Sequence, residues 1–236
     1  MNELLHFFTG YLIALVYLKP KDQKKGSYWS FGAFVGGVSG LLPDMAELFA
    51  DYGHATWSHT IIFASLLAVG LASLLLLFAK DLLSHIGFKS WKLFNLTWLA
   101  AMSHLFLDIF THQKFQCAEA ERDLKHIYFW PLWGQTFHMD CLFGWSYLVR
   151  ILVEWVIYLP IVIAILFYRK RKYGENPFAC LNYQNWDRIT DPQIQLSETI
   201  AAEKNAINRR VLIQKKILAV LFYLWILTYA VNYLFF

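Results

Sequence analysis

Histidine and aspartate side chains recur near the ends of the apolar segments of this sequence. His6 lies in the first apolar run, Asp44 follows Pro43, and His104 and Asp108 stand four residues apart in a later run. Residues four apart in an α-helix project from the same side, about one turn from each other. Such a pair can bind one metal ion, or its carboxylate can bridge two. Imidazole nitrogen combined with carboxylate oxygen suits Zn²⁺, with Mn²⁺ or Fe²⁺ as alternatives.

We predict five metal ligands that come from separate segments and meet at one membrane face: His6, Asp44, His59, His104 and Asp108. Asp44 and Asp108 are also the predicted catalytic residues. Between one and three ions are expected, and four more residues are candidates for an additional ion: His54, His112, His138 and Asp140. Taken singly, His6 fits a hydrogen-bonded packing residue and Asp44 fits a helix cap. Buried ionisable groups are costly in a membrane, so their convergence favours a functional site.

Arg150 is a candidate for binding an anionic group of a substrate, because its guanidinium is planar and permanently charged. The alternative is a helix ion pair with Glu154, four residues further along the chain. Both interpretations remain open at the level of the sequence.

The elements that must position these residues are membrane helices. The chain is 58% hydrophobic and only 16% charged, whereas a soluble domain carries roughly a quarter charged residues. An apolar run of about twenty residues in helical form can cross the hydrocarbon core. We therefore predict an all-α polytopic bundle with six membrane segments, at about 3–18, 28–49, 60–79, 91–111, 147–168 and 213–235.

The second segment differs from the others in its glycines. Gly32, Gly36 and Gly40 recur every four residues, and Pro43 interrupts the run just before Asp44. Glycines at this spacing let another helix approach closely, while the proline ends or kinks the helix.

Residues 1–146 form the predicted metal-site membrane domain, and residues 147–236 a two-helix membrane segment with a cytoplasmic insert at 169–210. Ile200, Ile207 and Val211 in and beside this insert have helical spacing, which predicts an amphipathic helix at the membrane surface. A disulfide between Cys117 and Cys141 is an open alternative to free thiols.

The basic residues predict the orientation. Loops around 19–27, 80–92 and 169–216 hold seventeen of the twenty-one Lys and Arg residues. Cytoplasmic loops are enriched in such residues, so we expect both termini and the predicted site at the outer face. The same bias explains the net charge of +4 without a nucleic-acid partner.

Motifs follow one another in a characteristic order: His6 with Gly10, Leu41-Leu42-Pro43-Asp44, HATWSHT at 54–60, SHLFLD at 103–108 and Trp130-Pro131. This series resembles the YdjM-like family of membrane-bound metal-dependent hydrolases over about residues 1–133. The resemblance implies a hydrolase, and a more distant similarity to zinc-dependent phospholipase C implies phosphoester hydrolysis at a zinc cluster. We therefore expect an integral protein of a prokaryotic inner membrane, with the site facing the periplasm or exterior.

The expected depth of His104 below the membrane surface favours a lipid or lipid-linked substrate. His104 lies about seven residues before the predicted end of its helix, which places it on the order of 10 Å below the surface. A lipid headgroup reaches that depth more readily than a soluble polymer. Two other functions stay open: a metal or proton transporter, which would need a polar path through the membrane, and a structural protein whose metal only fixes the helices.

Overall fold

The structure is a computed structural model that describes residues 3–18, 30–47, 60–86, 88–111, 149, 152–173, 179–186 and 201–235. Within these residues all regular secondary structure is helical. The prediction of an all-α chain is therefore confirmed, and each of the six predicted segments contains a helix.

The elements follow the chain in this order: α1 (Glu3–Tyr17), α2 (Ser30–Gly40), α3 (Leu42–Glu47), α4 (Ile61–Phe78), α5 (Lys80–His85), α6 (Ser90–Thr111), the π-helical segment η2 (Leu152–Tyr158), α9 (Leu159–Tyr173), the 3₁₀ turns η3 (Ala179–Leu181) and η4 (Tyr183–Asn185), and α10 (Ala201–Phe235). The segment η2 continues directly into α9, so the two make one rod.

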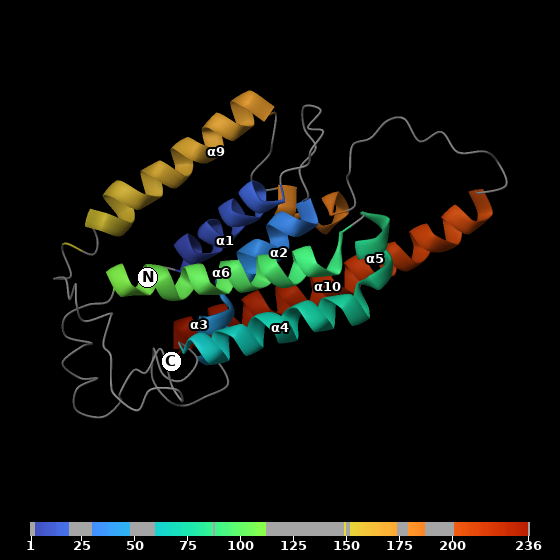
Figure 1. Ribbon diagram of the computed structural model, residues 1–236, viewed down its shortest axis with the longest axis horizontal. Helices are drawn as coiled ribbons and strands as arrows, with labels where there is room; N and C mark the ends of the chain where they lie inside the picture. Colours follow the sequence, from blue (N-terminus) through green and yellow to red (C-terminus); the bar gives the residue numbers. More distant parts are fainter. Residues whose placement is uncertain are drawn as a thin grey trace.

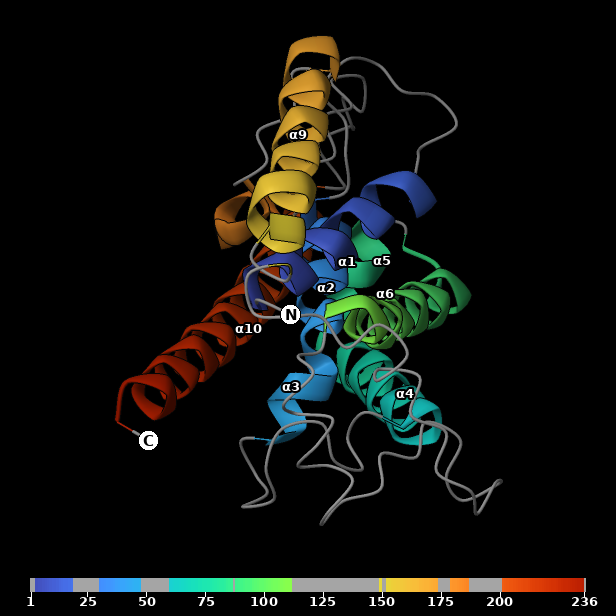
Figure 2. The ribbon, with the colours of Figure 1, turned by 90° about the vertical axis from the view of Figure 1, so that its left-hand side faces the viewer.

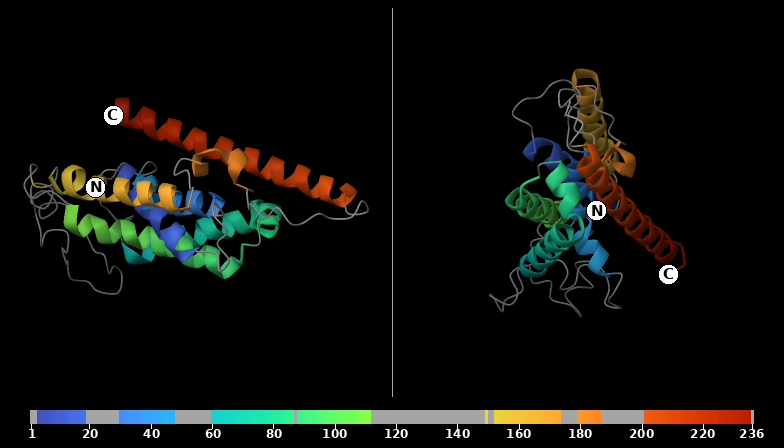
Figure 3. Two further views of the ribbon diagram at one scale, coloured as in Figure 1. Left: turned by 90° about the horizontal axis from the view of Figure 1, so that it is seen from above. Right: turned by 90° about the vertical axis from the view of Figure 1, so that its right-hand side faces the viewer.

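Figures 1 and 2 show α1, α2, α4 and α6 packed side by side, with α10 crossing them near α5 and α9 lying beside α1. Seen from above, α10 runs along one flank of the bundle (Figure 3). The start of α1, the end of α2, α3, the start of α4 and the end of α6 meet at one end of the molecule (Figure 1). The start of α2, the end of α4, α5 and the start of α10 lie toward the opposite end.

The second predicted segment is broken earlier than expected. Helix α2 ends at Gly40 and α3 begins at Leu42, so Asp44 lies within the first turn of α3 and not at the capping position before a helix. Glycine weakens the end of α2, and proline is tolerated in a first turn because its missing N–H has no partner there in any case. The break turns Asp44 toward the bundle.

The predicted insert at 169–210 also needs correction. Helix α9 continues to Tyr173, and α10 runs without interruption from Ala201 to Phe235. Ile207 and Val211 therefore belong to the same helix as the last apolar segment and do not form a separate surface helix. Ile200 lies outside the described residues.

Close packing of α1 on α2 depends on the predicted glycines. A Cβ atom on Gly10 would overlap the carbonyl oxygen of Gly36, and one on Gly40 would overlap the carbonyl oxygen of His6. A Cβ on Gly36 would lie 2.7 Å from that of Ala14. The two backbones touch at these points, so the glycines hold the turn of α1 that carries His6 against the end of α2.

The outward faces of several helices are apolar. Among the described residues, Ile61–Phe78 and Leu152–Arg171 are long and apolar enough to cross a membrane, and Leu5–Tyr17 is a shorter apolar stretch. On α4, Ala64, Ala68 and Ala72 are buried, while large side chains such as Leu74 and Leu77 are exposed. Small residues thus face the neighbouring helix, and large aliphatic ones face outward, as in membrane helices.

Gln214 joins α10 to α5. Its side-chain oxygen accepts the backbone N–H of Leu82 at 2.9 Å, and its amide nitrogen donates to Asp81 at 3.1 Å. Replacing Gln214 by leucine removes both bonds, and we expect a loss of about 1–3 kcal/mol in the free energy of unfolding. Chemical unfolding in detergent measures this loss. Thr228→Ala is the control, because the Thr228 hydroxyl donates to the carbonyl of Leu224 within its own helix, and an equal effect would contradict the prediction.

Cys180 lies in the turns between α9 and α10. Its carbonyl oxygen accepts the indole N–H of Trp186 at 2.7 Å, and Trp186 packs against Phe34 with ring centroids 4.3 Å apart. The thiol is fully buried, and burial raises the pKa of Cys180 from 9.0 to about 12.

We expect Cys180 to resist alkylation at pH 8, because a thiol with a pKa of about 12 carries almost no reactive thiolate at that pH. A chain with Cys117→Ser and Cys141→Ser should incorporate less than a tenth of an equivalent of maleimide when folded. It should incorporate one equivalent after denaturation. Rapid labelling of the folded chain would show that the turns do not seal Cys180.

Candidate metal centre

Four polar side chains from three helices meet at one end of the bundle. His6 comes from the first turns of α1, Asp44 from α3, and His104 and Asp108 from α6. All four are buried, Asp108 and His104 completely and Asp44 to about nine-tenths. These residues form what we call the His/Asp cluster.

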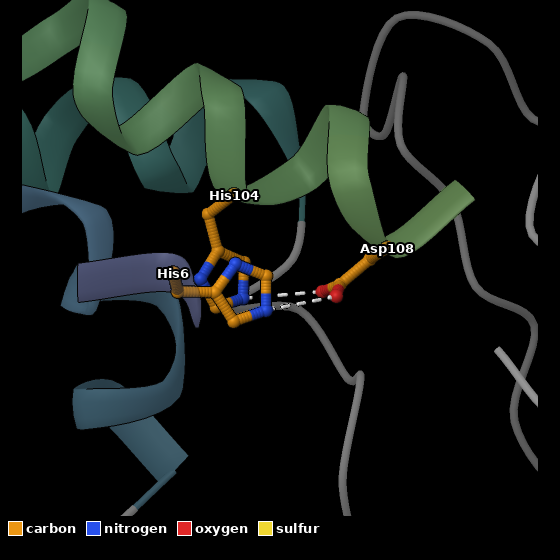
Figure 4. Close-up of side chains that lie close together, drawn as sticks. All are labelled: His6, His104 and Asp108. Carbon is orange, nitrogen blue, oxygen red and sulfur yellow. Dashed lines mark ion pairs between the residues drawn. The ribbon is translucent and has the colours of Figure 1, made fainter. Parts of the chain in front are cut away.

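Asp108 joins the two imidazoles. Its Oδ1 lies 3.1 Å from His6 Nε2 and its Oδ2 lies 3.1 Å from His104 Nε2. Figure 4 shows both ring edges facing the two oxygens of this one carboxylate. Because His104 and Asp108 are four residues apart on α6, the predicted projection from one side of a helix is confirmed.

His104 is the centre of the cluster. Its Nε2 also lies 3.2 Å from Asp44 Oδ1, so both carboxylates approach the same nitrogen. Its Nδ1 lies 2.8 Å from the carbonyl oxygen of Gly40. A carbonyl only accepts, so Nδ1 carries the proton and donates it to Gly40. A metal-ligating histidine typically uses its second nitrogen in this way, which fixes the ring and directs the other nitrogen to the ion.

The rings of His6 and His104 are stacked, with centroids 3.6 Å apart and planes 18° from parallel. The stack requires α1 and α6 to approach closely near the end of α2. Nδ1 of His6 is buried and has no hydrogen-bond partner among the described residues.

The donor set fits a divalent metal ion. One donor atom from each of His6, His104 and Asp108 can be chosen so that all three lie within 4.8 Å of one another. Two ligands bound to one zinc ion at about 2.0 to 2.1 Å with tetrahedral angles are about 3.3 Å apart, close to the 3.1 and 3.2 Å separations here. Two buried carboxylates also carry the charge that a divalent cation balances, and without such balance their burial is costly.

Four of the five predicted ligands are therefore brought together: His6, Asp44, His104 and Asp108. His59 and the candidates for an additional ion, His54, His112, His138 and Asp140, lie outside the described residues. Arg150 lies outside them as well, as do Cys117 and Cys141. Their predicted roles stay predictions.

Two features were not predicted, a contact of the cluster and a burial outside it. The carbonyl of Gly40 contacts His104, and the glycine spacing in 32–40 pointed only to helix packing. Glu154, the candidate ion-pair partner of Arg150, has a side chain that is only 3% exposed. A carboxylate within an otherwise apolar run was the available signal for this burial.

Residues 1–183 match the family described as YdjM inner membrane protein. The chain belongs to this family. The match covers the whole His/Asp cluster, and it extends beyond the recognised motifs through α9 to η4. No curated protein and no solved structure matches the chain.

Proposed function

We propose that this inner membrane protein is a metal-dependent hydrolase that cleaves a phosphate or carboxylic ester in a lipid or lipid-linked substrate. The observation that carries the proposal is the convergence of two imidazoles and two carboxylates, all buried, at one end of the helix bundle. Zn²⁺ is the proposed ion, because mixed nitrogen and oxygen donors suit it best.

The residues of the cluster have two proposed roles, binding the metal ion and transferring protons. His6, His104 and Asp108 are the proposed ligands, and Gly40 fixes the ring of His104 through its carbonyl. When bound, the ion would acidify a water molecule and stabilise negative charge on the substrate oxygen. Asp44 is the least buried member of the cluster, so its carboxylate is placed either to complete the ligand set or to accept a proton from the attacking water.

Depth supports a substrate that arrives from the membrane. His104 lies seven residues before Thr111, the last residue of α6, which corresponds to about 10 Å along the helix axis. We propose that the six helical segments cross the membrane and that the cluster faces the periplasm or exterior. Lys80 of α5 and the described basic residues in the first half of α10 support this orientation, since these elements lie toward the other end. The basic residues of α9 lie at the end of that helix that is farther from the cluster.

The interior favours an enzyme over a transporter. Beyond the His/Asp cluster, the described core to which α1, α2 and α6 contribute contains apolar side chains such as Leu15, Val35 and Leu93. A conduit for ions or protons needs ionisable groups along its whole length. Within the described part of the bundle, the buried histidine and aspartate side chains of α1, α3 and α6 gather at one end.

Activity of the purified protein in lipid nanodiscs tests the proposal. With Zn²⁺ present, we expect release of phosphate or an alcohol from at least one of three probes: a phospholipid, a lipid pyrophosphate or a chromogenic phosphodiester. A chelator should abolish the activity and zinc should restore it. If none of the probes is cleaved and His104→Ala leaves the zinc content unchanged, the proposal is wrong.

Asp44→Asn separates the two roles of that carboxylate. If Asp44 is the proton acceptor, Asp44→Asn should lower kcat by about 100-fold or more and leave the zinc content unchanged. If Asp44 is a metal ligand, the same substitution should lower zinc affinity and activity together. Full activity with full zinc content would exclude Asp44 from the site.

A further inference from the structure

Glu154 is a buried carboxylate on a segment whose neighbouring side chains are largely exposed. Its side chain is 3% exposed, whereas those of Leu152, Trp155 and Val156 are 51%, 44% and 60% exposed. Glu154 therefore points into the molecule, while the apolar side chains next to it in the sequence face outward and suit lipid. A buried ionisable group in a membrane segment is costly and usually functional.

The helical geometry around Glu154 is itself unusual. Leu152–Tyr158 is π-helical, a wider winding that is rare and occurs frequently at functional sites. With hydrogen bonds between residues five apart, residues four apart still lie on nearly the same face. Glu154 and Tyr158 thus share the face that packs inward.

The contact between Tyr158 and Thr9 fixes which part of α1 this face meets. The Tyr158 hydroxyl and the Thr9 hydroxyl are hydrogen-bonded. Both helices start at the same end of the molecule and run in the same direction (Figure 1). Moving back one turn from this contact leads to Glu154 on η2 and to Leu5 and His6 on α1. Glu154 therefore lies level with the turn that carries His6.

His6, on that turn of α1, has one imidazole nitrogen that a carboxylate could accept a hydrogen bond from. Its Nε2 faces Asp108, while its buried Nδ1 has no hydrogen-bond partner among the described residues. The corresponding nitrogen of His104 donates to Gly40. A histidine that binds metal through one nitrogen almost always donates the other N–H to a carboxylate, a carbonyl or water.

We propose that Glu154 is a positioning residue of the metal centre, whose carboxylate accepts the Nδ1–H of His6 when the ion is bound. This inference rests on the proposed metal centre. In this arrangement each stacked imidazole donates its Nδ1–H to a different acceptor, His104 to a backbone carbonyl and His6 to a carboxylate. The carboxylate would also raise the basicity of His6 as a ligand.

Co²⁺ binding to the full-length protein in nanodiscs tests the inference, with the visible absorption of the bound ion as the readout. Removing such a supporting partner typically weakens metal binding 10- to 100-fold. We expect Glu154→Gln to weaken Co²⁺ binding by about that factor and to shift the absorption bands, because the ring of His6 is less well oriented. Asp81→Asn is the matched control. It removes a carboxylate that bonds Gln214 away from the cluster, and it should leave affinity and spectrum unchanged.

Tyr158→Phe distinguishes support of His6 from packing of the helix. It removes the contact with Thr9 but keeps Glu154, and it should change affinity by less than threefold. Should Glu154→Gln fail to fold, Glu154→Asp replaces it, and its shorter side chain should still weaken binding at least threefold. Native affinity and spectrum in the folded Glu154 variant would overturn the inference alone. Absence of Co²⁺ and Zn²⁺ binding by the native protein would overturn the metal centre as well.

Discussion

Replacing His104 by alanine is expected to abolish stoichiometric metal binding. His104 contacts both carboxylates of the cluster through Nε2, and its Nδ1 donates to Gly40. Removing the imidazole takes away one nitrogen ligand and leaves Asp44 and Asp108 buried without it. We expect zinc affinity to fall by more than 100-fold, since loss of a ligand exceeds the 10- to 100-fold typical of a supporting residue. Elemental analysis of the purified protein measures this directly.

His85→Ala serves as the matched control for His104. Residue 85 ends α5, toward the other end of the molecule from the cluster. This variant should retain its zinc, so a general effect of removing a histidine can be separated from loss of a ligand. Unchanged zinc content in His104→Ala would show that the cluster is held by hydrogen bonds and ion pairs alone. Together with no cleavage of the three probes, this result would end the hydrolase proposal.

Gly10→Ala is expected to destabilise the protein strongly. A methyl group at this position would overlap the backbone of Gly36 and lie 3.2 Å from the amide nitrogen of Gly40. The obstacle is backbone and not a flexible side chain, so α1 and α2 must separate. We expect a loss of about 3 kcal/mol in the free energy of unfolding, at the upper end for overpacking. Chemical unfolding in detergent measures the loss.

The same variant should also weaken metal binding, because α1 carries His6 and α2 ends in the carbonyl that holds His104. Gly70→Ala on α4 is the control. A Cβ there meets nothing within 4 Å, so this change should be neutral or stabilise the helix by up to about 1 kcal/mol. If Gly10→Ala and Gly70→Ala unfold alike, the close approach of α1 and α2 does not matter for stability.

The sequence by itself determined the helices and the donor types. Runs of about twenty apolar residues have few ways to satisfy their backbone other than as helices, so the positions of α1, α4 and α6 were readable from composition. The spacing of His104 and Asp108 placed both on one helix face without knowledge of any other segment. Local patterns of this kind depend only on neighbours along the chain.

Contacts between helices were decided only by the tertiary structure. No local pattern tells which glycine carbonyl meets His104, that His6 stacks on the ring of His104, or that Asp108 faces both rings. The four-residue spacing of Arg150 and Glu154 predicts an ion pair on an ordinary helix, but it does not indicate how deeply Glu154 is buried. That its side chain is only 3% exposed is a result of the tertiary structure. Such contacts depend on how the helices rotate and slide against one another, which the close approach of Gly10 to Gly36 sets.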